Sequence, residues 1–180
     1  MIKNKKNIWI FLSLITIAAL TRLMPHPPNF TAIGSIALFG GMVAKSKYLK
    51  YLLPIGALFI SDIVISLFAG TAFLHNTVLW VYASFLLIVL LGSFMKKITI
   101  GNVLGASVLS ATLFFLVTNF GEWASGLMYP MTLNGLTACY AAAIPFFANS
   151  LISTVLFSAI LFGGYSFVDS KGHIKAEVRA

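Results

Sequence analysis

Apolar runs that approach about 20 residues, the length of a helix that crosses the hydrocarbon core of a bilayer, recur along the whole chain. Of its 180 residues, 59% are hydrophobic and only 9% are charged, whereas a soluble domain has about 25% charged residues. A soluble fold of this length has too little interior to bury so much apolar surface. The sequence therefore predicts an all-α, polytopic membrane protein with a single domain, residues 1–180.

Basic residues fall in clusters that alternate with nearly uncharged breaks. The clusters are Lys3, Lys5 and Lys6; Lys45, Lys47 and Lys50; Lys96 and Lys97; and Lys171, Lys175 and Arg179. Cytoplasmic loops of membrane proteins carry such an excess of Lys and Arg. This pattern places both termini in the cytoplasm and explains the net charge of +8 without nucleic acid. It also favours a retained first helix over a cleaved signal peptide.

Apolar runs and charges together predict six transmembrane helices. The spans are about 8–23, 32–44, 51–69, 77–95, 98–120 and 145–168, with a short outer-surface helix at about 133–143. Pro145 suits the first turn of helix six. The second span would reach only about 20 Å at 1.5 Å per residue. A re-entrant segment there would put the lysines at 45–50 outside, so we expect a full crossing.

Polar, aromatic and rigid residues concentrate in the three predicted outer connections. These are TRLMPHPPNF at 21–30, GTAFLHN at 70–76 and NFGEWASGLMYP at 119–130. Prolines that end helices and an interfacial belt of Trp and Tyr would explain part of this composition. The charged and amide residues favour a substrate-binding site instead. The candidates are Arg22, His26, Asn29, Asp62, His75, Asn119, Glu122, Trp123, Tyr129 and Cys139.

Asp62 lies near the middle of the third predicted helix, where an unpaired carboxylate costs on the order of 2.5–3.5 kcal/mol on insertion scales. Arg22 is the only basic residue on the outer half and is its expected partner. The pair either contributes to a binding site or merely ties helices one and three together.

Cys139 is the single cysteine and is interpreted as a small packing residue. The alternative, a soft ligand for a transition metal together with His26 or His75, has no spacing motif behind it. We therefore assign no metal site and no cofactor. An intramembrane enzyme would need a nucleophile–base or metal constellation at spanning depth, and Asp62 is alone there. We expect the protein not to be an enzyme.

The segments LMPHPPNFTAIGSIALFGG, FLVTNFGEW and TACYAAAIPFFANSLISTVLF resemble a family of small bacterial integral membrane proteins described only as candidate transport proteins. More remotely, the layout is similar to the S components of energy-coupling factor (ECF) vitamin transporters, which include cobalamin-binding relatives. This resemblance implies an S-component-like bundle in the bacterial inner membrane, with a pocket on its outer face. It also implies an energising ATPase or coupling module as a partner. Helix one, however, lacks the Ala-x-x-x-Ala spacing used for that contact and offers only Ser13, Thr16, Ala18 and Ala19.

These observations favour a membrane transport protein that captures a small molecule, either vitamin-like or a metal-containing micronutrient, from the outer side. Its expected partners are this substrate and the lipid bilayer. A structural or assembly membrane protein without a small-molecule substrate is the alternative, although it would leave the composition of the outer connections unexplained. An intramembrane enzyme is the least favoured class.

Overall fold

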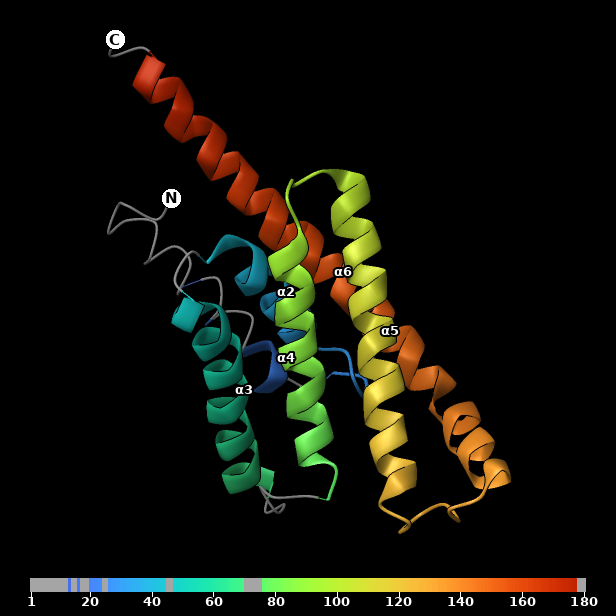
Figure 1. The fold of residues 1–180 in the computed structure, drawn as a ribbon. Coiled ribbons are helices and arrows are strands. Elements are labelled where there is room, and N and C mark those ends of the chain that lie inside the picture. The colour runs from blue at the N-terminus through green and yellow to red at the C-terminus, as the bar shows by residue number, and fades with distance from the viewer. Residues whose placement is uncertain are drawn as a thin grey trace.

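The computed structural model describes residues 13, 16, 20–23, 26–44, 47–69 and 76–177. Within these ranges the regular structure is entirely helical (Figure 1). A short 3-10 helix precedes five α-helices. Their bounds are η1 Thr21–Leu23, α2 Ile33–Val43, α3 Lys47–Ala69, α4 Val78–Phe94, α5 Ile100–Ala124 and α6 Leu133–Glu177.

Three helices are long and apolar enough to cross a membrane: Tyr48–Phe68 within α3, Ile100–Ala124, and Leu133–Asp169 within α6. α2 and α4 are apolar but shorter. The all-helical membrane class is thus supported by helix length and composition. Most of the predicted first span, 8–23, lies outside the described residues, which include only positions 13, 16 and 20–23 of it.

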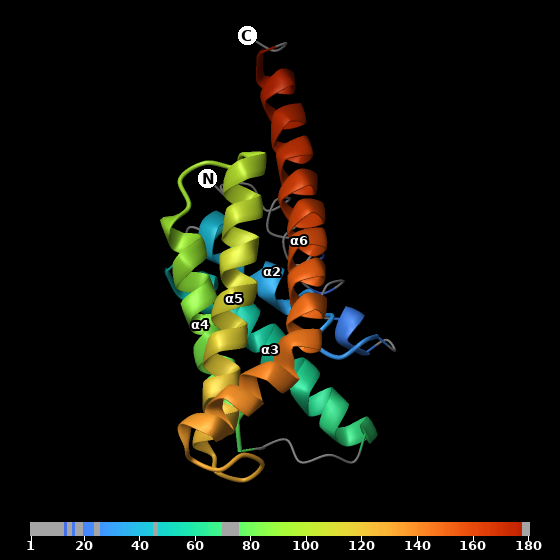
Figure 2. The same ribbon diagram turned by 90° about the vertical axis from the view of Figure 1, so that its right-hand side faces the viewer.

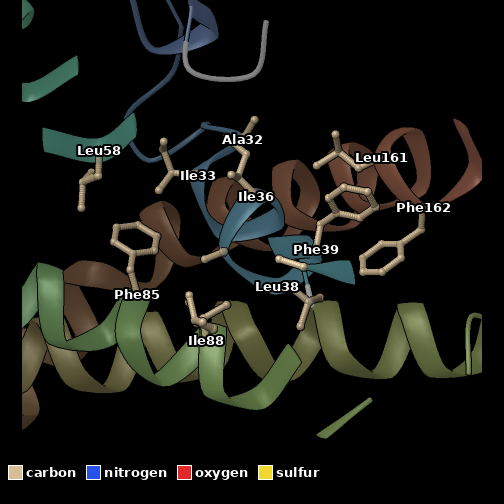
Figure 3. Close-up of a cluster of buried hydrophobic side chains, with 13 residues drawn as sticks. Ala32, Ile33, Ile36, Leu38, Phe39, Leu58, Phe85, Ile88, Leu161 and Phe162 are labelled. Carbon is tan, nitrogen blue, oxygen red and sulfur yellow. The ribbon is translucent and has the colours of Figure 1, made fainter. Parts of the chain in front are cut away.

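α2 is the centre of the bundle, enclosed by the other helices. Its residues from Ile33 to Gly41 are almost all buried, and Ile36, Leu38 and Phe39 have no exposed surface. Phe39 lies edge-on to Phe162 of α6, with ring centroids 5.1 Å apart (Figure 3). An apolar helix without a polar face needs such enclosure by neighbours.

Two glycines let α2 and α4 touch through their backbones. A Cβ atom on Gly41 would collide with the Val89 carbonyl, and one on Gly92 would collide with the Leu38 carbonyl. Small residues at a helix contact allow this close approach in membrane proteins. The second half of α2 is therefore fixed tightly against α4.

The second predicted span differs from the structure in its depth. α2 has 11 residues, about 16 Å of helix against about 30 Å of hydrocarbon. Its first turn adjoins Leu58, Phe85 and Ser110, which lie in the interior of α3, α4 and α5 rather than at their ends. α2 thus starts level with the interior of these three helices, and residues 32–44 alone do not form a full helical crossing.

The bounds of α5 and α6, the helices on either side of the last connection, also differ from the predicted ones. α5 continues to Ala124, so Asn119, Glu122 and Trp123 belong to its last turns and not to a loop. α6 has 45 residues and passes through Pro145 without ending. Figure 2 shows its orange first part at an angle to the red remainder. A proline removes one backbone hydrogen bond and bends a helix, and here this bend replaces the break predicted before residue 145.

Candidate functional site

Arg22 and Asp62 form an ion pair inside the bundle. Arg22 Nη1 donates to Asp62 Oδ1 over 2.7 Å, and the two side chains are only 18% and 17% exposed. The same nitrogen donates to Ser61 Oγ at 2.6 Å and to the Leu58 carbonyl at 3.4 Å. The predicted pairing of Arg22 with Asp62 is therefore confirmed.

Tyr82 of α4 completes this network. Its hydroxyl donates to Asp62 Oδ2 over 2.9 Å, so both carboxylate oxygens accept a hydrogen bond. Two charges taken out of water are tolerated only when their remaining hydrogen-bonding positions are also satisfied. The network thus holds three elements together at one depth: η1, α3 and α4.

A cavity of about 270 Å³ adjoins the ion pair and is lined by residues from each of the helices α2 to α6. Arg22 and Asp62 contribute to its lining, together with Ser110 of α5 and Ser150 and Thr154 of α6. Apolar residues form much of the remaining wall: Ile33, Leu58, Ile65, Val81, Phe85, Ile88, Ala111 and Phe114. We call this space the central cavity. It combines a small number of polar groups with apolar walls, as small-molecule sites do.

The proline-rich loop closes the side of the central cavity next to α2. His26, Asn29 and Thr31 all line it. Pro27 and Pro28 have fixed φ angles, and the Pro27 carbonyl accepts from the Phe30 amide at 3.0 Å and from His26 Nδ1 at 2.8 Å. The loop is therefore held in one turn by local contacts.

Further contacts tie this loop to α6. Asn149 Nδ2 donates to the Pro28 carbonyl over 3.0 Å, and the Phe30 and Phe157 rings meet edge-on. Asn29 lies between these anchors with φ 63°, a left-handed conformation that Asn adopts more readily than most residues. The wall formed by the loop is thus rigid, as the three prolines of TRLMPHPPNF suggest.

Asn119 and Cys139 lie beside the central cavity. Asn119 lines a smaller cavity of about 60 Å³ that shares Asn29, Phe114 and Ser150 with it. Its side-chain amide donates to Phe115 O of its own helix, and the buried Cys139 donates to the Asn119 carbonyl at 3.4 Å. Cys139 therefore packs α6 against α5. The described part of the chain contains no group of three or more His, Cys, Asp and Glu that could hold a metal ion.

Glu122, Trp123 and Tyr129 do not line the central cavity. Trp123 Nε1 donates to the carbonyls of Pro130 and Thr132 at 3.1 and 3.2 Å, so its ring fixes the connection between α5 and α6. Trp123 and Tyr129, two of the predicted substrate-binding residues, therefore lie away from the central cavity. His75 lies outside the described residues. Of the ten candidates, four meet in the central cavity: Arg22, His26, Asn29 and Asp62.

Several residues of the site were missed by sequence reasoning. The sequence-based candidates do not include Tyr82, Ser150 or Thr154. Hydroxyl residues grouped in one apolar segment, Ser150, Ser153 and Thr154 here, are a signal that could have found them. Such groups need partners inside a membrane bundle.

The chain belongs to the family described as "Family of unknown function (DUF6580)", which matches residues 2–176. No curated protein and no solved structure matches it.

Proposed function

Because membership of that family assigns no activity, we propose from the site itself that the protein is a multi-pass membrane transport protein that captures a small molecule in the central cavity. The observation that carries this proposal is the convergence of a partly buried ion pair and a proline-rich loop on one cavity inside an apolar bundle. A purely structural ion pair needs no adjoining space. A ligand site does need such space.

The volume of the central cavity indicates the size of the ligand. A volume of about 270 Å³ lies just below the range of drug-sized pockets. This favours a small vitamin-like molecule over a large metal-containing cofactor such as a cobalamin.

The lysine pattern supports access from outside. The basic residues Lys96 and Lys97 lie between α4 and α5, whereas the connection between α5 and α6, residues 125–132, carries no charged residue. By the positive-inside rule, the end of the bundle at which α5 ends and α6 begins is the outer one. The resemblance to bacterial candidate transport proteins agrees with placement in the inner membrane.

A structural or assembly role is the competing function. It is favoured by the same ion pair, because a network that joins η1, α3 and α4 would stabilise the bundle with or without a ligand. The two functions differ in what happens when the cavity is filled by a side chain.

A cavity-filling variant therefore provides the test. Ala111 is 2% exposed and lines the central cavity, so Ala111→Phe should occupy it. Val108→Phe adds a ring one turn earlier on α5, at a position that is 41% exposed, and serves as the matched control. The purified proteins are screened by thermal unfolding against a library of vitamins and their precursors, because a ligand that binds only the folded state raises the melting temperature.

We expect at least one compound to stabilise the wild type and Val108→Phe but not Ala111→Phe, and to enter cells that express the wild type faster than cells that express Ala111→Phe. If every compound acts equally on all three proteins, capture in the central cavity is excluded and the structural role stands.

A further inference from the structure

We propose that the ligand of the central cavity is a small organic monocarboxylate with an apolar or aromatic body, bound through the unused edge of the Arg22 guanidinium. This inference rests on the proposed function and specifies its substrate class.

Arg22 has donors to spare. Its three hydrogen bonds, to Leu58, Ser61 and Asp62, all come from Nη1. A guanidinium has five N–H donors, and those on Nε and Nη2 have no hydrogen-bond partner among the residues that the structure describes. Arg22 nevertheless lines the cavity. Such an edge can donate two parallel hydrogen bonds to a carboxylate.

The other polar groups of the cavity can also donate hydrogen bonds to a carboxylate. The side chains of Asn29, Thr31 and Thr154 line it and make no side-chain hydrogen bond within the described ranges. α2 begins at the same place, with Ile33 and Gly34 in the lining. The first amides of a helix lack intrahelical acceptors and carry partial positive charge, which adds to the field of Arg22.

The charge balance distinguishes a monoanion from other ligands. Both oxygens of Asp62 already accept a hydrogen bond, from Arg22 and from Tyr82, and Arg22 balances its charge, so a cationic ligand would have to compete with Arg22 for this carboxylate. A dianion would carry more charge than the partial charge of the helix end can balance, and would lie near the Asp62 carboxylate. One negative charge fits best.

The rest of the cavity suits an apolar body. Ile65 of α3, Val81 and Phe85 of α4, and Phe114 of α5 form its walls. Apolar walls around a few fixed polar groups orient a ligand by its polar end. The carboxylate would therefore lie toward Arg22 and the start of α2, with the body between α3, α4 and α5.

Matched acids and amides test this assignment, because they share size and shape and differ in charge. Benzoate is compared with benzamide, and 3-phenylpropanoate with 3-phenylpropanamide, on the purified protein by the concentration dependence of the melting temperature. Phenyl phosphate and benzylamine serve as the dianion and the cation. We expect the acids to bind at least about tenfold more tightly than their amides, because charge-assisted hydrogen bonds are stronger than neutral ones.

The Arg22→Lys variant tests whether the Arg22 guanidinium is the group that binds the carboxylate. Lysine can still pair with Asp62, but its ammonium group has no second planar edge. The variant should lose the preference for acids over amides, whereas Val108→Phe should keep it. Should Arg22→Lys not fold, Thr31→Val replaces it as a milder change, with a smaller but measurable weakening of acid binding.

Equal binding of acids and amides, a preference for phenyl phosphate or benzylamine, or acid binding that Ala111→Phe leaves intact would each overturn the monocarboxylate assignment. If no probe binds while a library compound does stabilise the wild type through the cavity, the assignment is wrong and the capture function survives. If no library compound distinguishes Ala111→Phe either, the capture function fails with it.

Discussion

Tyr82 and Asp62 belong to different helices, and the Tyr82 hydroxyl donates to the carboxylate oxygen that Arg22 does not bind. The carboxylate is thereby held between η1 and α4. The stability of the bundle and the proposed ligand binding both depend on this network, and the two can be tested separately by substitution.

Removing only one partner of the Arg22–Asp62 ion pair should strongly lower the free energy of unfolding, because the remaining charge then has no partner. Arg22→Gln or Asp62→Asn alone leaves one charge in a poorly solvated place, a loss of about 3–5 kcal/mol for a well-buried pair. The double variant should be clearly more stable than the sum of the two single losses predicts. A double-mutant cycle on the free energy of unfolding measures this coupling, and strict additivity would show that the contact contributes nothing.

Tyr82→Phe should lower stability by about 1.5–3 kcal/mol, because it removes a hydrogen bond to a charged group and adds no cavity. Tyr48→Phe is the control, since Tyr48 is 82% exposed at the start of α3. Thermal unfolding in the same detergent compares the two. A Tyr82→Phe protein that unfolds with the wild type would mean that Asp62 does not need its second partner.

Gly92→Ala should disrupt the contact between α2 and α4, because its Cβ would collide with the Leu38 carbonyl. Overpacking of this kind costs about 1–3 kcal/mol or more. Gly101→Ala and Gly105→Ala on α5 provide a contrast, because an added Cβ there meets no atom within 4 Å. Those two changes should be neutral or stabilising, since alanine is the better helix former. Equal effects at all three glycines, again measured by thermal unfolding, would contradict the close contact.

The orientation of the protein in the membrane can be tested by labelling the two ends of α5. In a Cys139→Ala background, Ser125→Cys should react with a membrane-impermeant maleimide in intact cells, because Ser125 follows the outer end of α5. Lys97→Cys lies before the other end and should react only after the membrane is permeabilised. The opposite labelling pattern would invert the topology inferred from the lysines.

Sequence reasoning reached the ion pair because the chain offers little choice: one carboxylate in an apolar run and one arginine on that side. The ends of α4 lie within one residue of the predicted span 77–95. The depth of α2 could not be predicted, because charge patterns locate the ends of a crossing and not where a helix starts within it. Tyr82 was missed for a related reason: its partner is 20 residues away in sequence, and only the packing of α3 on α4 brings the two together.

The continuity of α6 through Pro145 could not be predicted from local rules alone. A proline suits a helix start as well as a bend, and the choice depends on tertiary contacts. Cys139 packs on Asn119 before the proline, and Asn149 holds Pro28 after it. These contacts fix the segments on both sides of Pro145.

The half-depth position of α2 bears on the distance a solute would travel. A molecule in the central cavity already lies level with the interior of α3, α4 and α5, and the 11 residues of α2 extend from there toward the lysine-rich end. The remaining barrier is therefore about 16 Å of packed helix, roughly half of a hydrocarbon core. In the proposed transport function, release to the far side would require a path past one short helix and not across a whole membrane.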